Sequence, residues 1–403
     1  MRISLFCLLL AFSGLTFAQQ ITITGKVVDA ETKEALPFAS VFITGKTVGV
    51  VSNAQGEFDF HIPADMRNDI LAVSMIGYKT FEAPVWSLLN ADSKPAVIEL
   101  QTMAVLLNEV VVRDTLRAGE ILKLAISRVE QNFPMEPFMM EGFYRDLKKL
   151  GGTYISLLEA AVKISDDNYI EPRNKYKLRE RVALKEVRRS LGYGSRFTAF
   201  FDKDNLLEDL LLNNNVRYRQ FPEEDEFFKT LKFEEDTHYN NREVFVVTHT
   251  RDFLLRIYID KETYGIMHLE YVNEHKEDLE KVRGLESKFA KVKRTIDFKF
   301  IEGKLYLNYL MVTSQVNWYD LNTGDLKFEA ELQRQLLINK INPKSKERIS
   351  LAQKMKGYGL QYQDLPYNKT FWDNYNVIKS TPLDKKIIED LEREEPLEKQ
   401  FKE

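Results

Sequence analysis

Cysteine is almost absent from this sequence. The only cysteine among the 403 residues is Cys7, which lies in a short apolar run near the start of the chain. Arg2 precedes this run and Thr16-Phe17-Ala18 follows it, as in a secretory signal peptide that is cleaved after a small residue. We therefore expect residues 1–18 to be removed. The mature chain would then contain no disulfide and no thiolate, and Cys7 lies too early to become a lipid anchor.

The sequence also lacks long apolar runs. The signal segment is too short to cross a bilayer as a stable helix, and no later run approaches the roughly 20 apolar residues of a transmembrane helix. A net charge of −4 gives no general attraction to nucleic acid or to anionic lipid. These absences predict an exported protein, soluble or peripheral to a membrane. We expect no nucleic-acid partner and no transmembrane segment after signal removal.

Histidine is scarce, which bears on metal chemistry. The five histidines are His61, His238, His249, His268 and His275. None begins the H-x-x-E or H-E-x-x-H pattern with which zinc peptidases hold their metal. The sequence also contains no G-x-S-x-G, no P-loop and no G-x-G-x-x-G. We therefore expect no catalytic residue, no metal and no cofactor. His249 and His268 fall on predicted strands, where a functional pair is one interpretation and half-buried structural side chains are the favoured one.

The sequence does contain a set of short strands near the N-terminus. Residues 21–28 and 38–43 are rich in β-branched and aromatic side chains, and polar turn residues separate the two runs. After a turn at residues 53–56, Phe58 and Phe60 alternate with polar residues, as in a strand with one buried face. The pattern continues to about residue 113 and predicts a small β-sandwich.

The same stretch resembles a known family. The segments that carry the resemblance are GKVVD at 25–29, LPFASV at 36–41, SNAQGEF at 52–58 and IGY at 76–78. Together they resemble the carboxypeptidase regulatory-like domain, a transthyretin-like β-sandwich that accompanies some metallocarboxypeptidases and occurs in TonB-dependent outer-membrane receptors. The resemblance covers about residues 21–113. It implies the fold and a place in a Gram-negative envelope, in the periplasm or at the periplasmic face of the outer membrane.

The resemblance does not imply a function by itself, because this module occurs in many unrelated proteins. In the receptors, a segment similar to residues 107–112, which we expect to be the last strand, precedes a plug domain. No plug sequence follows here, so we expect no transport channel. The missing H-x-x-E pattern likewise restricts the carboxypeptidase resemblance to the accessory module.

The rest of the chain has patterns typical of an antiparallel sheet. Apolar residues at helical spacing in residues 117–132, closed by Pro134 and Pro137, predict a connecting helix. Hairpins are expected at residues 138–164, 254–272 and 295–312, a helix at 195–213 and a strand at 229–235. The segments FMMEGFYRDL, YISLLEAAVKI and LRIYIDKETYGIMHLEY resemble the curved half-barrel sheets of periplasmic lipoprotein carriers.

The expected fold class is mostly β, or α+β, with an N-terminal β-sandwich followed by a curved antiparallel sheet domain with helices. The expected units are a signal peptide at residues 1–18, the sandwich at 19–113, a connecting helix at 114–136, the sheet domain at 137–341 and a tail at 342–403. The tail should end in a charged amphipathic helix at residues 382–400.

One candidate site is a row of cations at every second position. Its members are Arg173, Lys175, Lys177, Arg179 and Arg181. On an extended strand these side chains would share one face and form a stripe for an anionic partner. The favoured alternative is an edge strand that its charge protects from aggregation, or a mobile loop.

A second candidate site is a set of aromatic side chains on the predicted sheet. Its members are Phe298, Phe300, Tyr306, Tyr309 and Trp318. A curved antiparallel sheet can leave one apolar face concave, and these rings would then contact a lipid or a peptide. The favoured alternative is that they form a closed core beneath the helices.

The sequence as a whole predicts a non-enzymatic binding or scaffold protein of the cell envelope, whose sandwich docks a protein partner at the periplasmic side of the outer membrane. The alternative is a carrier or sensor of an apolar ligand in the curved sheet. The third hypothesis is a hydrolase with an unrecognised site. An apolar concavity would favour the carrier, a flat closed surface the scaffold, and a deep polar pocket with shifted pKa values the hydrolase.

Overall fold

A computed structural model describes residues 20–89, 94–103, 116–190, 200–201, 206–275, 278–355, 359–360, 363, 365–379, 382–393 and 395–401. The expected signal peptide and the expected strand at residues 107–112 lie outside them, as does most of residues 195–205.

The N-terminal part consists of two small sheets. The first contains β4 (Glu57–Pro63), β1 (Gln20–Asp29) and β7 (Ala96–Leu100), in that order, and the second contains β3 (Gly49–Val51), β2 (Ser40–Ile43), β5 (Ile70–Ser74) and β6 (Phe81–Pro84). η1 (Ala64–Asn68) and α2 (Val85–Leu88) lie between strands. Ile23, Phe58 and Val41 are buried in one core shared by both sheets. The alternation of apolar residues along β1 and β4 produces this shared core, which confirms the predicted N-terminal sheet domain.

The second part is one sheet of twelve strands. The strands are β8 (Phe138–Leu150), β9 (Thr153–Asp166), β10 (Arg181–Arg189), β11 (Lys232–Phe233), β12 (Thr237–Tyr239), β13 (Arg242–His249), β14 (Leu254–Asp260), β15 (Ile266–His275), β16 (Glu280–Val282), β17 (Leu285–Ile301), β18 (Lys304–Asp320) and β19 (Leu326–Asn342). Their order is β10-β9-β8-β19-β18-β17-β15-β14-β13-β11, with β12 on β13 and β16 on β17. The pairs are antiparallel and the sheet is open, because β10 and β11 stand at opposite ends. The predicted fold class is therefore confirmed.

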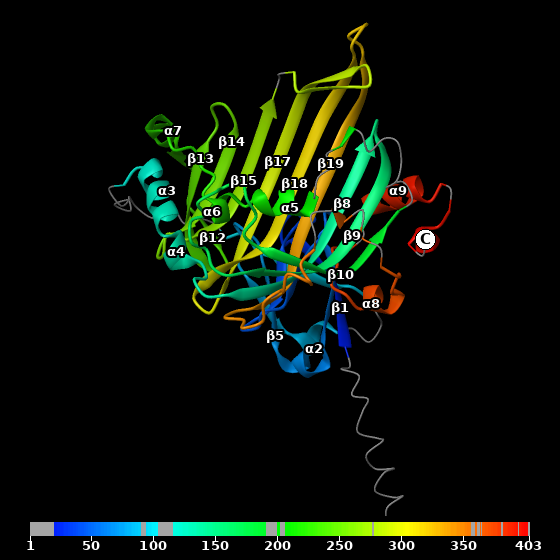
Figure 1. Ribbon diagram of the computed structural model, residues 1–403. Helices are drawn as coiled ribbons and strands as arrows, with labels where there is room; N and C mark the ends of the chain where they lie inside the picture. Colours follow the sequence, from blue (N-terminus) through cyan, green and yellow to red (C-terminus); the bar gives the residue numbers. More distant parts are fainter. Residues whose placement is uncertain are drawn as a thin grey trace, which may run out of the picture.

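Irregularities in pairing bend the longest strands. The pairing of β17 with β18 shifts after Ser287 and again after Asp297, and the pairing of β19 with β8 shifts after Ile338. A bulge of this kind bends its strand and increases the local twist. Figure 1 shows the resulting curved sheet, with α5 (Leu206–Leu212) and α6 (Asn215–Tyr218) lying across its concave face.

Helices cover the concave face only in part. α3 (Ala118–Ser127), α4 (Val129–Asn132) and α7 (Asp225–Thr230) lie toward the β13 end of the sheet. Side chains of α3, such as Ile121, share one buried cluster with Phe298 and Tyr306 of the sheet. α5 and α6 cover the middle of the sheet. The concave ends of β17, β18 and β19 extend beyond these helices (Figure 1).

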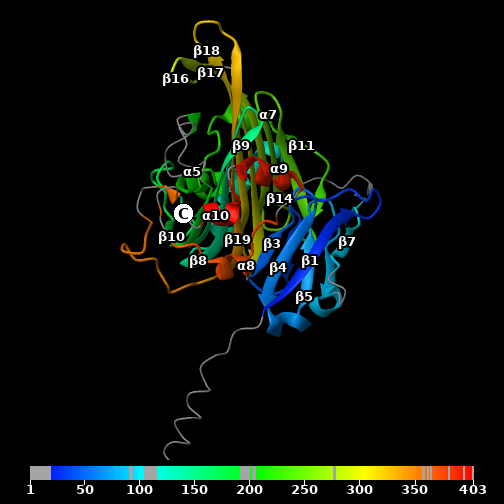
Figure 2. The same ribbon diagram turned by 90° about the vertical axis from the view of Figure 1, so that its right-hand side faces the viewer.

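The sandwich and the tail cover the convex face. Phe38 of the sandwich stacks on Tyr309 of β18, with 5.5 Å between ring centroids. The tail contains α8 (Lys369–Asp373), α9 (Pro382–Leu391) and α10 (Leu397–Gln400). Trp372 of α8 packs edge-on against Phe143 of β8, and α9 packs on Leu147 and neighbouring side chains. Figure 2 shows the sandwich and α5 on opposite sides of the sheet.

Three element predictions are corrected by the structure. The strand predicted at residues 229–235 is wrong, because α7 continues to Thr230 and only Lys232–Phe233 pairs with β13. The single helix predicted at residues 382–400 is two helices, since Pro396 has no N–H to continue an α-helical ladder. The helix predicted at residues 117–132 breaks at Arg128 into α3 and α4.

A buried carboxylate links the convex face of the sheet to the tail. Glu159 of β9 accepts hydrogen bonds from Arg145 at 2.7 Å and from Arg188 at 2.6 Å. Arg188 also lies 4.3 Å from the Trp372 ring centroid, and Arg145 donates to the Ile378 carbonyl. Burial opposes ionisation of Glu159, but Arg188 and Arg145 outweigh it and lower the pKa of the carboxyl.

The Glu159→Gln variant should lose about 3 kcal/mol of unfolding free energy, because the buried guanidinium of Arg145 and the half-buried guanidinium of Arg188 would lose their carboxylate. Urea denaturation at neutral pH measures this loss. The control Glu347→Gln removes a carboxylate that pairs with Lys163 at the surface, and it should cost less than about 1 kcal/mol. Equal effects of the two substitutions would contradict the linking role of Glu159.

Candidate binding cavity

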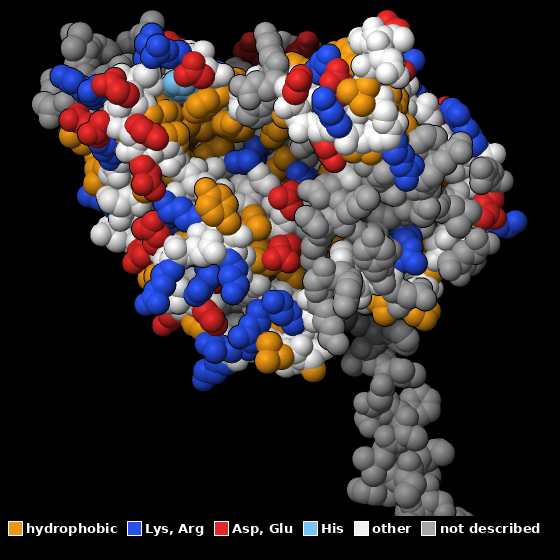
Figure 3. Space-filling view, turned by 45° about the horizontal axis from the view of Figure 1, so that its top comes forward, with side chains coloured by type: hydrophobic (Ala, Val, Ile, Leu, Met, Phe, Trp, Pro, Cys, Tyr) orange, Lys and Arg blue, Asp and Glu red, His pale blue; other side chains and the backbone are white. Residues whose placement is uncertain are grey.

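A cavity of about 680 Å³ lies on the concave face, along the outer halves of β18 and β19. Its lining residues are Phe200, Phe201, Leu279, Glu280, Val282, Arg283, Ser287, Ser314, Val316, Trp318, Ala330, Leu332 and Arg334. Figure 3 shows hydrophobic side chains gathered in a hollow of this face, with Lys and Arg side chains within and around it. The volume falls in the range of about 300–1,000 Å³ that is typical of small-molecule sites.

The alternation of side chains along the strands determines which residues line the cavity. Ser314, Val316 and Trp318 follow one another at every second position of β18, so all three project to the concave face. Leu332 is paired with Ser314 and projects to the same face. Phe200 packs edge-on against Trp318 at 5.2 Å. The walls therefore combine apolar and aromatic side chains with polar and charged ones, and neither kind predominates.

Arg334 lies at the inner end of this cavity. It is opposite Val312 of the neighbouring strand β18. Its side chain forms an ion pair through Nη1 with Asp209 of α5. Its Nε atom is buried, with no hydrogen-bond partner among the described residues. Asp209 belongs to the helix that crosses the sheet here, so this ion pair also anchors α5.

Arg294 of β17 lies in the same row of side chains. It is paired with Val312, the residue that pairs with Arg334 on the other side. Its two terminal nitrogens donate to the side-chain oxygens of Asn213 and Asn215. Burial lowers the pKa of Arg294 to about 10, so the guanidinium is still charged at neutral pH. Arg294 lines a second cavity of about 310 Å³ on the other side of α5 and α6.

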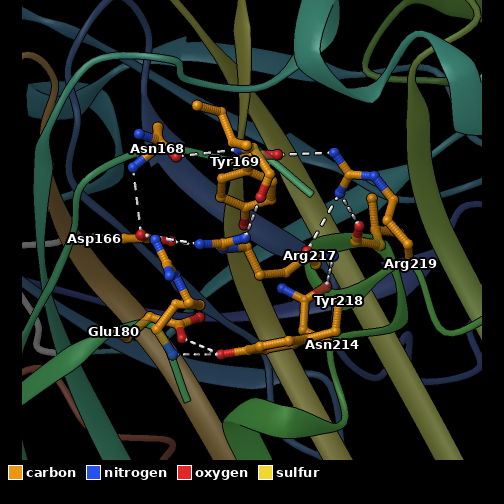
Figure 4. A network of polar contacts seen from close by, with 11 residues as sticks. Asp166, Asn168, Tyr169, Glu180, Asn214, Arg217, Tyr218 and Arg219 are labelled. Atoms are coloured by element: carbon orange, nitrogen blue, oxygen red, sulfur yellow. Dashed lines mark hydrogen bonds and ion pairs between the residues drawn. The ribbon is translucent and has the colours of Figure 1, made fainter. Parts of the chain in front are cut away.

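A buried polar network fixes α6 to the sheet (Figure 4). Arg217 of α6 donates to both oxygens of Asp166 at the end of β9, at 2.6 and 3.1 Å. Tyr218 donates to Glu180 and accepts from the backbone N–H of Arg179. The network therefore holds the segment between β9 and β10 against α6.

The predicted cation stripe lies in this same segment, and its premise of an extended strand is wrong. Residues 171–180 form turns and irregular backbone, and β10 begins only at Arg181. Lys175 pairs with Glu223 at 2.7 Å, and Arg181 donates to the Ile349 carbonyl. Arg173, Lys177 and Arg179 are exposed. The five side chains thus have different surroundings and do not form one charged face.

The predicted aromatic face is divided between the two sides of the sheet. Phe298, Tyr306 and Trp318 are buried in the concave cluster, and Phe300 packs against its margin. Tyr309 belongs to the convex cluster with the sandwich. A shift in strand pairing after Asp297 moves Phe298 opposite Leu307 and changes which residues are neighbours. Of the five, only Trp318 lines the cavity.

The sequence analysis missed Arg334 and Arg294. A signal for both was present, because each interrupts an apolar period-two face: Arg334 lies between Leu332 and Leu336, and Arg294 lies between Val292 and Ile296. A charged residue in that position must project into a core or a cavity. His249 and His268 are not a pair, since His249 contacts Thr230 and His268 contacts Asp297.

The described residues form neither a metal-binding cluster nor a membrane-spanning helix. No three His, Cys, Asp or Glu side chains in these ranges gather so that they could hold a metal ion. No helix in the same ranges is long and apolar enough to cross a membrane.

Comparison with known proteins identifies the N-terminal part. Residues 23–112 match the family model of the CarboxypepD_reg-like domain. The N-terminal sandwich is a CarboxypepD_reg-like domain. This confirms the resemblance seen in residues 25–78, and the match ends before the twelve-stranded sheet begins.

One curated relative matches a short part of the chain. The TonB-dependent receptor SusC of Bacteroides thetaiotaomicron is 38% identical over 78 residues, which are 19% of this chain and 7% of the receptor. The chain therefore matches only a small fraction of the receptor's length.

Solved structures resemble the chain more distantly. A LolA superfamily protein from Nitrosomonas europaea is 13% identical, with a TM-score of 0.20, and the likeness covers 58% of this chain and 99% of that one. A chain of the MucA/MucB complex of Pseudomonas aeruginosa is 8% identical, with a TM-score of 0.19, and the likeness covers 57% of this chain and 99% of that one.

The CarboxypepD_reg-like domain covers a buried polar group on the convex face. Asp297 accepts hydrogen bonds from Tyr239 at 2.6 Å and from Asn308 at 2.8 Å, and lies 3.0 Å from Nδ1 of His268. Asn308 also contacts Ser40 of the domain at 3.3 Å. These side chains are buried, so they hold the domain on the sheet and offer no open site.

Burial and ion pairing shift the pKa values of this polar group in opposite directions. Burial disfavours the charged form of His268, but Asp297 and Glu270 outweigh it and raise the pKa to about 9. Burial lowers the pKa of Lys299 to about 8, and its Nζ has no hydrogen-bond partner among the described residues. A Cβ atom at Gly49 of the domain would lie 3.7 Å from this Nζ. The domain thus excludes water from the convex side of β17.

The network around α6 gives a pH prediction. Burial, with the charge of Asp166, raises the pKa of Glu180 from 4.5 to about 7. Between these pH values the folded protein holds a proton that the unfolded chain releases, so Glu180 makes unfolding free energy fall as the pH rises. Glu180→Gln should remove that fall and stabilise the protein at pH 8, by roughly 1 to 3 kcal/mol.

Urea denaturation at pH 5 and pH 8 measures both effects. The control Glu171→Gln changes an exposed glutamate of the same segment and should leave the difference between the two pH values as in the wild type. A Glu180→Gln variant with the wild-type pH dependence would show that Glu180 does not carry the raised pKa.

Proposed function

We propose that this chain is a non-enzymatic binding protein of the cell envelope that holds an apolar or amphiphilic ligand in the concave cavity. The observation that carries the proposal is the cavity of about 680 Å³ between β18, β19 and the segments beside them, with walls formed by Trp318, Phe200 and Leu332. A cavity with apolar walls gains binding free energy from the apolar area of a ligand that it removes from water.

The covering of the sheet supports this proposal over a closed core. The sandwich and the tail fill the convex face, where Tyr309 and Phe143 are buried against them. On the concave face the helices cover the β13 end and the middle, and the cavity lies beyond them. Binding in this cavity requires no catalytic residue, which agrees with the absence of catalytic motifs from the sequence.

The location is proposed from three features. Residues 1–18 have the pattern of an export signal, residues 23–112 match the CarboxypepD_reg-like domain, and 78 residues of the chain are 38% identical to the TonB-dependent receptor SusC. We therefore propose that the protein works in the periplasm or at the periplasmic face of the outer membrane.

A second candidate function is docking of an envelope protein by the CarboxypepD_reg-like domain. Trp86 of α2 and Val97 of β7 are 56% and 64% exposed on this domain, where they could contact a partner protein. The two functions are compatible, because the docking side chains and the cavity lie on different parts of the chain.

Filling the cavity tests the ligand-binding function. The neutral fluorescent probe N-phenyl-1-naphthylamine should bind the full chain with a blue-shifted emission. Ser314→Phe places a ring in the cavity and should weaken this binding roughly tenfold or more, because the probe would lose apolar contact area. Fluorescence titration gives both dissociation constants.

Gln315→Phe is the matched control, since Gln315 is the next residue of β18 and projects to the opposite face. It should bind the probe like the wild type. If the wild type does not bind the probe, or if both variants weaken binding equally, the cavity is not a ligand site.

A further inference from the structure

The inner end of the cavity contains a cation with unused hydrogen-bonding capacity. Arg334 is 5% exposed, and its Nη1 forms an ion pair with Asp209. Its Nε is buried and has no hydrogen-bond partner among the described residues. A buried donor without an acceptor costs about 1–3 kcal/mol. The inner end of the cavity therefore contains a charged group that would gain from a polar ligand atom, and Trp318 Nε1 at the outer end is a neutral donor that is likewise buried without a partner among the described residues.

The ion pair between Arg334 and Asp209 is open to water on the side of the carboxylate. Asp209 has a side chain that is 42% exposed, so water can solvate its carboxylate if the ion pair opens. Arg334 belongs to the central strand β19, so it stays in the cavity if the Asp209 carboxylate moves away. An anionic ligand group could therefore replace Asp209 on the guanidinium at small cost.

The charges around this end favour an anion over a cation. Arg294 donates its terminal nitrogens to the amide oxygens of Asn213 and Asn215, which are neutral, and its own Nε is also unpartnered among the described residues. Asp146 and Lys148 are buried on β8 beside this row and add one charge of each sign. The described charged groups at this end are therefore three cations, Arg334, Arg294 and Lys148, and two carboxylates, Asp209 and Asp146.

The rest of the cavity is shaped for a chain. Strand pairing places Arg334 beside Val312 at the inner end and Phe328 beside Trp318 at the outer end. Six residues of strand separate these positions, a length of about 20 Å. Between them Leu332 and Ala330 line the cavity, and neither carries a charge. The buried cation thus lies at the inner end, and apolar side chains of β18 and β19 line the way to Trp318, beside Ser314 and with Glu280 and Arg283 also in the lining.

We propose that the cavity binds a single-chain amphiphile with a carboxylate or phosphate head, that Arg334 binds the head at the inner end, and that the apolar chain runs along β18 and β19 toward Trp318. This inference rests on the proposed function and names the ligand class of the same cavity. Guanidinium groups bind carboxylate and phosphate through paired hydrogen bonds, which suits either head group.

Three ligands with the same chain separate the role of the head from that of the cavity. Isothermal titration of the full chain is carried out with tetradecanoate, tetradecyl phosphate and the neutral tetradecanamide. The wild type should bind at least one anion roughly tenfold or more tightly than the amide. Comparison of the two anions tells a carboxylate site from a phosphate site.

Two substitutions should move the affinity for the anion in opposite directions. Arg334→Gln should weaken binding of the preferred anion roughly tenfold or more and leave binding of the amide within about twofold. Asp209→Asn removes the competing carboxylate and should strengthen binding of the anion, a result that a folding defect cannot produce. Arg283→Gln makes the same chemical change at an exposed cation of the cavity margin and should have little effect.

The outcomes separate the two proposals. If none of the three ligands binds to the wild type, the proposed function fails and this inference fails with it. If the anions and the amide bind equally, the cavity is a ligand site but the inference is wrong. Equal loss of anion and amide in Arg334→Gln also overturns it, since Arg334 would then only shape the cavity. A larger loss in Arg283→Gln than in Arg334→Gln would place the head at the margin and overturn it as well.

Discussion

One constraint governs the rest of the structure: the large sheet carries apolar side chains on both faces, so both faces must be shielded from water. β17, β18 and β19 are each seventeen residues long, and apolar residues such as Tyr309 and Leu310 point to opposite faces. An uncovered apolar face of this size would be unstable in water. The CarboxypepD_reg-like domain and the tail cover the convex face, whereas the helices cover the concave face only in part. The cavity lies on the part of the concave face that the helices leave uncovered.

The local elements could be predicted from the sequence, and their arrangement could not. The hairpins of residues 138–164 and 254–272 are present because each joins neighbouring strands through a short polar turn. The pairing of β8 with β19 joins segments almost 200 residues apart, which no local pattern indicates. The docking of Phe38 on Tyr309 likewise depends on a contact between two separate units. Residues at such interfaces look like ordinary buried aromatics in the sequence.

The candidate site was predicted only in outline. A concave apolar face was expected, but strand bulges decided which aromatic residues reach it, and only Trp318 lines the cavity. The five cations at residues 173–181 do not share one face, because residues 171–180 are not an extended strand. Side chains at every second position share a face only in a strand. Arg334 and Arg294 were overlooked although each breaks an apolar alternation. A search for charged residues on apolar faces would have found both.

Native mass spectrometry of the protein, purified without detergent from its own cell envelope, tests the central claim most directly. The account predicts that the wild type carries a small amphiphilic molecule, released on activation in the gas phase, and that the Ser314→Phe variant purified in parallel carries much less. A wild-type protein that is free of any such molecule, or equal occupancy in the two proteins, would contradict the claim that the concave cavity is a ligand site.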